Sequence, residues 1–117
     1  MTIRLTVQMR TAAEDADRFR DFLLELRTKI RQQEADTSVV YDIFHADGDE
    51  FVVTEAYHDS DGLLIHLGNL GASGIDAFKF TVERMIVCGS LSPEAQAVLP
   101  RLGAKELLIY PTRLGNR

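Results

Sequence analysis

Two polar side chains, His66 and Asn69, stand three residues apart in the stretch SDGLLIHLGNL. Residues three apart lie on the same face of a helix, and the leucines of this stretch would form the buried face. Imidazole is the side chain best suited to act as a general base near neutral pH, and a carboxamide can hold a developing oxyanion. We therefore predict His66 as the catalytic base and Asn69 as its oxyanion partner, with Gly62 one turn earlier leaving room for a ligand. The alternative is that His66 is a hydrogen-bonded histidine at the margin of the core.

Glu55 is a carboxylate inside the strand-like run FVVTEAY. An unpaired buried charge is costly, so this group needs a raised pKa, a cationic partner or access to solvent. Two interpretations stay open. Glu55 either binds the substrate and accepts a phenolic proton, or it has a structural role, in an ion pair with Arg84 or Lys79 or in a contact that holds the dimer together.

Tyr41 and Tyr57 lie in the two strand-like runs on either side of the segment DGD. Their rings could pack against an aromatic substrate while their hydroxyls orient it, so we predict both as substrate-binding residues. The alternative is that they are half-buried core residues, as strand tyrosines often are.

The remaining histidines, His45 and His58, fall at the ends of strand-like runs and are expected to be exposed. Their spacing to Glu55 and His66 matches no metal-binding helix pair, and no glycine-rich phosphate loop follows a strand. We therefore predict neither a metal nor an organic cofactor.

The composition describes a single domain over residues 1–117, with 45% hydrophobic residues and a net charge of -5. That charge repels nucleic acid and anionic lipid surfaces. The single cysteine excludes an intrachain disulfide, and no apolar run approaches the roughly 20 residues that a membrane span needs. We expect a soluble cytoplasmic protein without nucleic-acid or membrane partners.

Apolar residues recur with a period of two in some segments and at helical spacing in others, which predicts alternating strands and helices. Thr11 and Glu14 form a capping-box pattern, and Ser92 followed by Pro93 is typical of a helix start. The expected elements are a strand over 3–9, a helix ending near 35, a hairpin of 38–46 and 50–57, a helix from 59 or 60 to about 70, a helical piece over 75–80, a strand over 82–90, a helix over 93–102 and a strand over 105–112.

This order predicts an α+β fold with a ferredoxin-like antiparallel sheet and helices on one face. Both faces of the hairpin strands and of the strand over 82–90 are apolar, although a sheet with one solvated face would alternate. The chain has no further helices to cover the second face, so we expect the sheet of a second copy there, in a homodimer. The alternative is a monomer with an exposed apolar sheet.

The stretch YDIFHADGDEFVVTEAYHDSDGLLIHL resembles the antibiotic-biosynthesis monooxygenase-like superfamily of dimeric α+β barrels. The positions that carry this resemblance are Tyr41, the turn ADGD, Glu55 with Tyr57, Asp59, and His66. The resemblance implies a cavity between the sheet and its own helices, which several relatives use for oxygenation without a cofactor. In that chemistry the protein deprotonates an electron-rich aromatic, and the carbanion reduces dioxygen directly. This chain has Tyr57 where relatives often have tryptophan, and its lack of any tryptophan argues against haem degradation.

The function that we predict is a cofactor-independent monooxygenase acting on a small phenolic, quinol or polycyclic aromatic substrate. A ligand-binding dimer without catalysis and a proton-transferring isomerase are the alternatives. A cavity beside His66 that is closed to solvent, with Asn69 directed into it, favours an enzyme, whereas a cavity filled by Phe78 or Phe80 favours a protein without chemistry.

Overall fold

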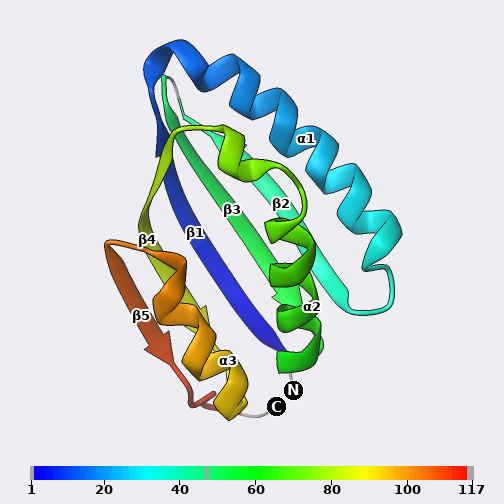
Figure 1. The fold of residues 1–117 in the computed structure, drawn as a ribbon. Helices are drawn as coiled ribbons and strands as arrows, with labels where there is room; N and C mark the ends of the chain where they lie inside the picture. The colour runs from blue at the N-terminus through cyan, green and yellow to red at the C-terminus, as the bar shows by residue number, and fades with distance from the viewer. Residues whose placement is uncertain (1, 47, 116–117) are drawn as a thin grey trace.

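The computed structural model describes residues 2–46 and 48–115, which form one sheet with every helix on the same face (Figure 1). Within this part of the chain the strands and α-helices are β1 (Ile3–Thr11), α1 (Ala16–Gln33), β2 (Ser38–His45), β3 (Glu50–Tyr57), α2 (Ser60–Gly71), β4 (Phe80–Cys88), α3 (Pro93–Val98) and β5 (Glu106–Tyr110). Short 3-10 helices, η1 (Ala13–Asp15), η2 (Ile75–Ala77) and η3 (Leu99–Leu102), extend the connections. The predicted α+β architecture is confirmed.

The five strands lie in the order β2-β3-β1-β4-β5. The first three pairings are antiparallel, as expected, but β5 runs parallel to β4. The prediction of a wholly antiparallel sheet is therefore wrong at this edge, and the sheet is mixed. The reason is that α3 and η3 form a crossover, which returns the chain to the end of the sheet where β4 begins.

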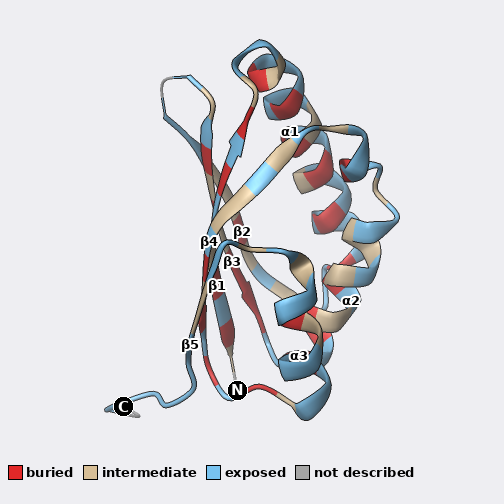
Figure 2. Ribbon diagram, turned by 60° about the vertical axis from the view of Figure 1, so that its left-hand side comes forward, coloured by how far each residue is buried: buried red, intermediate tan, exposed pale blue. Residues whose placement is uncertain are grey.

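The core lies between the sheet and the helices. β1 alternates between buried and exposed residues along its length, and β3 turns Phe51, Val53, Glu55 and Tyr57 toward the same side. Figure 2 shows the buried residues of the sheet and of α1 facing one another. Phe19 is fully buried, and its ring packs against Phe51 at a centroid distance of 5.3 Å. The strand period thus directs Glu55 into the helix-covered layer together with apolar neighbours.

Two of the three predicted helix starts are confirmed. The Asp59 side chain accepts a hydrogen bond from the Gly62 amide at 2.9 Å, and Ser92 accepts one from the Ala95 amide at 3.2 Å. The capping box at Thr11 is wrong, because β1 continues through Thr11 and α1 begins only at Ala16. None of the helices within residues 2–46 and 48–115 has the length and apolar composition to cross a bilayer.

Gly62 is buried against protein rather than open to a ligand, which corrects the expectation from sequence. A Cβ atom at this position would lie 3.2 Å from the Thr37 Cβ and carbonyl oxygen and 3.4 Å from the Tyr57 Cβ. Gly62→Ala should therefore lower the free energy of unfolding by about 1 to 2 kcal/mol, because the first turn of α2 must shift away from β3. Urea unfolding would measure this. Gly68→Ala is the control, since nothing lies within 4 Å of a Cβ there, and equal stability loss in both variants would contradict the packing argument.

No helix covers the second face of the sheet in the described residues (Figure 2). The strand period places Val40, Phe44, Ile86 and Tyr110 on that face, and Phe44 is 58% exposed. β1, in the middle of the sheet, adds polar residues such as Gln8 to the same face.

We propose that a second copy of the chain packs against this face. Sedimentation at micromolar concentration should then give about twice the 13.1 kDa chain mass. Phe44→Glu should shift the protein toward monomer, because it places a charge in the contact. Leu24→Glu, at a position 46% exposed on α1, is the control that should leave the mass unchanged. A 13.1 kDa species for the unaltered chain would contradict the proposal.

Candidate acid–base site

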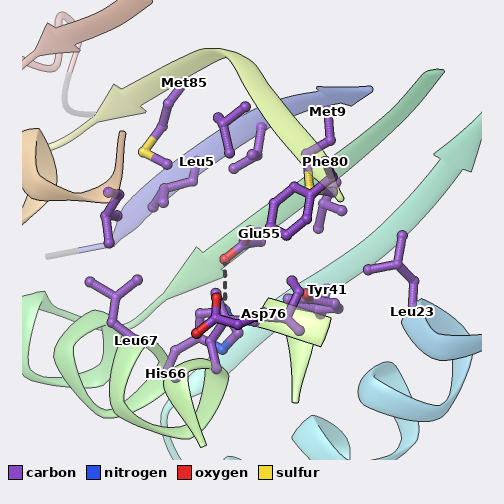
Figure 3. Close-up of a pocket in the computed structure, with 17 residues that line it drawn as sticks. Leu5, Met9, Leu23, Tyr41, Glu55, His66, Leu67, Asp76, Phe80 and Met85 are labelled. Carbon is purple, nitrogen blue, oxygen red and sulfur yellow. Dashed lines mark ion pairs between the residues drawn. The ribbon is translucent and has the colours of Figure 1, made fainter. Parts of the chain in front are cut away.

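A cavity of about 220 Å³ lies between the sheet and the helices (Figure 3). Its walls are mostly apolar side chains from β1, β3, β4, α1 and α2, together with Tyr41, Glu55, His66 and Asp76. Phe80 forms part of the wall without filling the space, and Phe78 packs instead against Phe22 at a centroid distance of 4.9 Å. Neither Phe78 nor Phe80 fills the cavity, so the arrangement expected of a protein without chemistry is not the one observed. The arrangement expected of an enzyme is met only in part, because Asn69 does not line the cavity.

Glu55 projects from β3 into this cavity and is only 7% exposed. The Tyr57 hydroxyl donates a hydrogen bond to Glu55 Oε1 at 2.6 Å. His66 Nε2 lies 3.4 Å from the same oxygen, a contact that Figure 3 marks with a dashed line. The expected structural pairing with Arg84 or Lys79 is wrong, since Arg84 lies 3.3 Å from Glu106 at the parallel edge of the sheet. Glu55 is paired with groups of the site itself.

His66 is held from its other side by Glu34. The Nδ1 atom of His66 lies 3.2 Å from both carboxylate oxygens of Glu34, and both residues are almost fully buried. A carboxylate only accepts hydrogen bonds, so this contact places the proton on Nδ1 and leaves Nε2 directed toward Glu55 and the cavity. The imidazole therefore lies between two glutamates, one on each nitrogen.

Glu34 is the functional residue that sequence reasoning missed. It is the C-cap residue of α1, where its amide donates to the Ile30 carbonyl at 2.8 Å. It also lies four residues after buried Ile30, so it continues the apolar stripe of the helix. A carboxylate on such a stripe is the signal that could have identified it.

Asn69 does not line the cavity. Its Nδ2 atom donates a hydrogen bond to Glu34 Oε2 at 3.1 Å. Since Glu34 in turn contacts His66, Asn69 positions the glutamate behind the imidazole. Asn69 thus has no contact with the cavity through which it could stabilise a substrate oxyanion, which is the role predicted from its spacing to His66.

The two predicted tyrosines flank His66. The Tyr41 ring lies 5.4 Å from the His66 ring and Tyr57 lies 5.3 Å from it, measured between centroids. Tyr41 is on the cavity wall, whereas Tyr57 is behind Glu55 and is fully buried. Burial and the neighbouring Glu55 raise the pKa of both tyrosine hydroxyls, so both remain protonated, and the Tyr57 hydroxyl donates to Glu55.

Burial is the main cause that raises the pKa of Glu55 above its ordinary value. The nearby His66 and the hydrogen bond from Tyr57 lower it in part, and Glu34 raises it further. The direction follows from desolvation, which penalises a charged carboxylate in an apolar cavity. Glu55 is therefore more readily protonated than an ordinary glutamate, and His66 Nε2 lies 3.4 Å from its Oε1.

The described residues contain no group of three or more His, Cys, Asp or Glu side chains arranged to hold a metal ion. In the candidate site, the two ring nitrogens of His66 point to different glutamates on opposite sides, so these three side chains do not converge on one point. His45 and His58 are both exposed, as expected, and neither lines the cavity.

The mixed sheet with its single layer of helices gives a fold similar to that of several solved structures, one of them named a putative antibiotic biosynthesis monooxygenase. Among solved structures, MupZ from Pseudomonas fluorescens is similar with a TM-score of 0.76 and 19% identity, over 99% of this chain and 94% of that one. A protein from Deinococcus radiodurans named a putative antibiotic biosynthesis monooxygenase is similar with a TM-score of 0.60 and 18% identity, over 74% and 89%.

Rv0793 from Mycobacterium tuberculosis is similar with a TM-score of 0.61 and 19% identity, over 79% of this chain and 97% of that one. No protein-family model and no curated protein sequence matches the chain. At identities of 18 to 19%, these similarities show a shared fold and do not show a shared reaction.

Proposed function

We propose that this protein is a cofactor-independent acid–base enzyme that moves protons on a small, largely apolar substrate. The observation that carries the proposal is the 3.4 Å contact between Glu55 Oε1 and His66 Nε2 at the wall of an apolar cavity of about 220 Å³. A pair of titratable groups in contact at a cavity wall, with the pKa of the carboxyl raised by burial, is typical of acid–base catalysis.

Each group has a role that follows from its contacts. Glu34 holds the Nδ1 proton of His66, so Nε2 is the atom that can remove a proton from a substrate in the cavity. Glu55 Oε2 has no hydrogen-bond partner among the described residues, so it is available to a substrate oxygen. A protonated Glu55 can then donate to that oxygen as His66 takes up the substrate proton.

The cavity limits the size of the substrate. An engineered apolar cavity of about 150 Å³ holds benzene, so about 220 Å³ suits a substituted single ring or a compact bicyclic molecule. This size favours the phenolic and quinol substrates predicted from the sequence over the larger polycyclic ones.

Monooxygenation is the more specific candidate within this proposal. It is supported by the fold shared with the Deinococcus radiodurans protein that is named a putative monooxygenase. Its first step is the same proton removal by His66, after which the substrate carbanion would reduce dioxygen. Without dioxygen consumption, return of the proton at another carbon would give an isomerase.

A panel of small phenols, quinols and cyclic ketones in D2O tests these alternatives. Oxygen uptake that accompanies substrate loss would support the monooxygenase, and deuterium incorporation without oxygen uptake would support the isomerase. Binding of panel members with neither reaction would contradict the proposal and favour the ligand-binding dimer. Mass spectrometry and an oxygen electrode supply the two measurements.

A further inference from the structure

We propose that the cavity accepts a substrate without negative charge, and that Asp76 at its mouth favours a substrate bearing a protonated amine. This inference rests on the proposed function, because it concerns the substrate of the same cavity. It adds a class of substrate and a specificity-determining residue that lies outside the acid–base pair.

The first observation is the charge of the cavity wall. Asp76 lines the cavity, Glu34 lies directly behind His66, and Glu55, also on the wall, resists ionisation because burial raises its pKa. No lysine or arginine occurs among the lining residues. A carboxylate substrate would thus lose its hydration without gaining a cationic partner other than His66, which is already held by two glutamates.

The second observation is the position of Asp76. This residue lies in η2, directly after Gly74 has turned the chain with a φ of 90°. Asp76 is exposed and makes no hydrogen bond or ion pair within the part of the chain that the structure describes. It is drawn in Figure 3 with the cavity residues, on a segment separate from those that carry Glu55 and His66.

The third observation is that Asp76 also lines an adjoining groove of about 320 Å³. The inner cavity and this groove share Asp76, Phe80, Val82 and Leu102, so the groove leads to the mouth of the cavity. Lys105 is the cation of the groove, but its Nζ lies 3.1 Å from Glu83 Oε2. Asp76 therefore keeps its charge available to a ligand that enters along the groove.

Three probes that share one ring isolate the effect of charge: benzylamine, benzyl alcohol and benzoate. Isothermal titration at low ionic strength, where surface charges act most strongly, should show the amine binding about 3- to 10-fold more tightly than the alcohol, and benzoate most weakly. Asp76→Asn should make the amine and the alcohol bind equally. Asp76→Lys should make benzoate bind more tightly than the amine.

Glu94→Gln is the matched control, because it removes the same charge from an exposed position on α3 that lines neither the cavity nor the groove. It should leave the order of the probes unchanged. An unaltered order in Asp76→Asn, or the same change in Glu94→Gln, would overturn this inference while leaving the acid–base proposal intact. Failure of all three probes to bind the unaltered protein would count against both.

Discussion

His66→Gln is expected to lower turnover of a reactive panel substrate by about 10²-fold or more, with the fold retained. A positioned general base contributes roughly 10² to 10⁴ in rate, and glutamine cannot accept and return a proton near neutral pH. Its amide can still donate to Glu34, so the buried carboxylate keeps a partner. The rate of deuterium exchange or oxygen uptake measures the loss.

His58→Gln is the matched control for this substitution. His58 is exposed directly after β3 and does not line the cavity, so its replacement should leave the rate unchanged. Circular dichroism should show that both variants are folded. A rate for His66→Gln within about threefold of the unaltered protein would remove His66 from the mechanism.

Glu55→Gln should have two opposite effects, a loss of activity and a gain in stability at neutral pH. The loss follows because an amide cannot deliver a proton to the substrate, and we expect about 10²-fold. The gain follows because burial raises the pKa of Glu55, which means that the folded state resists its ionisation. Glutamine resembles the protonated carboxyl in shape and carries no charge.

The sign of the pH dependence follows from proton uptake. Below the ordinary pKa of glutamate, Glu55 is protonated in both the folded and the unfolded state and carries no penalty. As the pH rises above that value, the unfolded state ionises first, so the free energy of unfolding falls until the raised folded pKa is reached. Glu55→Gln should therefore be more stable than the unaltered protein by about 1 to 3 kcal/mol at pH 7 and nearly equal to it at pH 4.

Urea unfolding at the two pH values measures this difference. Glu94→Gln is again a suitable control, since its exposed carboxylate should give no comparable pH-dependent gain. The contrary result would be that Glu55→Gln is nearly as stable as the unaltered protein at pH 4 but less stable than it at pH 7. That result would show that the folded state stabilises the carboxylate, and it would contradict this prediction.

The parts of the fold that depend on local signals could be predicted from the sequence. The alternation of β1, the hairpin around DGD and the helix caps at Asp59 and Ser92 are set by neighbouring residues. The direction of β5 could not be predicted in the same way, because it depends on where the α3 crossover returns the chain.

The candidate site was predictable only in part, for the same reason. His66 could be identified from its own helix, and Glu55 from its odd place in a strand. Glu34 contacts His66 across 32 positions of sequence, so no local pattern joins them. The role of Asn69 changed with that contact, because its spacing to His66 specified a shared helix face but not the acceptor of its hydrogen bond.

The most direct test is a pH titration of the Glu55 side-chain carboxyl carbon by ¹³C NMR, assigned by comparison with Glu55→Gln. If Glu55 and His66 share a proton at the cavity wall, the midpoint lies clearly above the ordinary glutamate value of about 4.3, and the ring signals of His66 shift over the same pH range. A midpoint at or below the ordinary value, without any accompanying change at His66, would contradict the account.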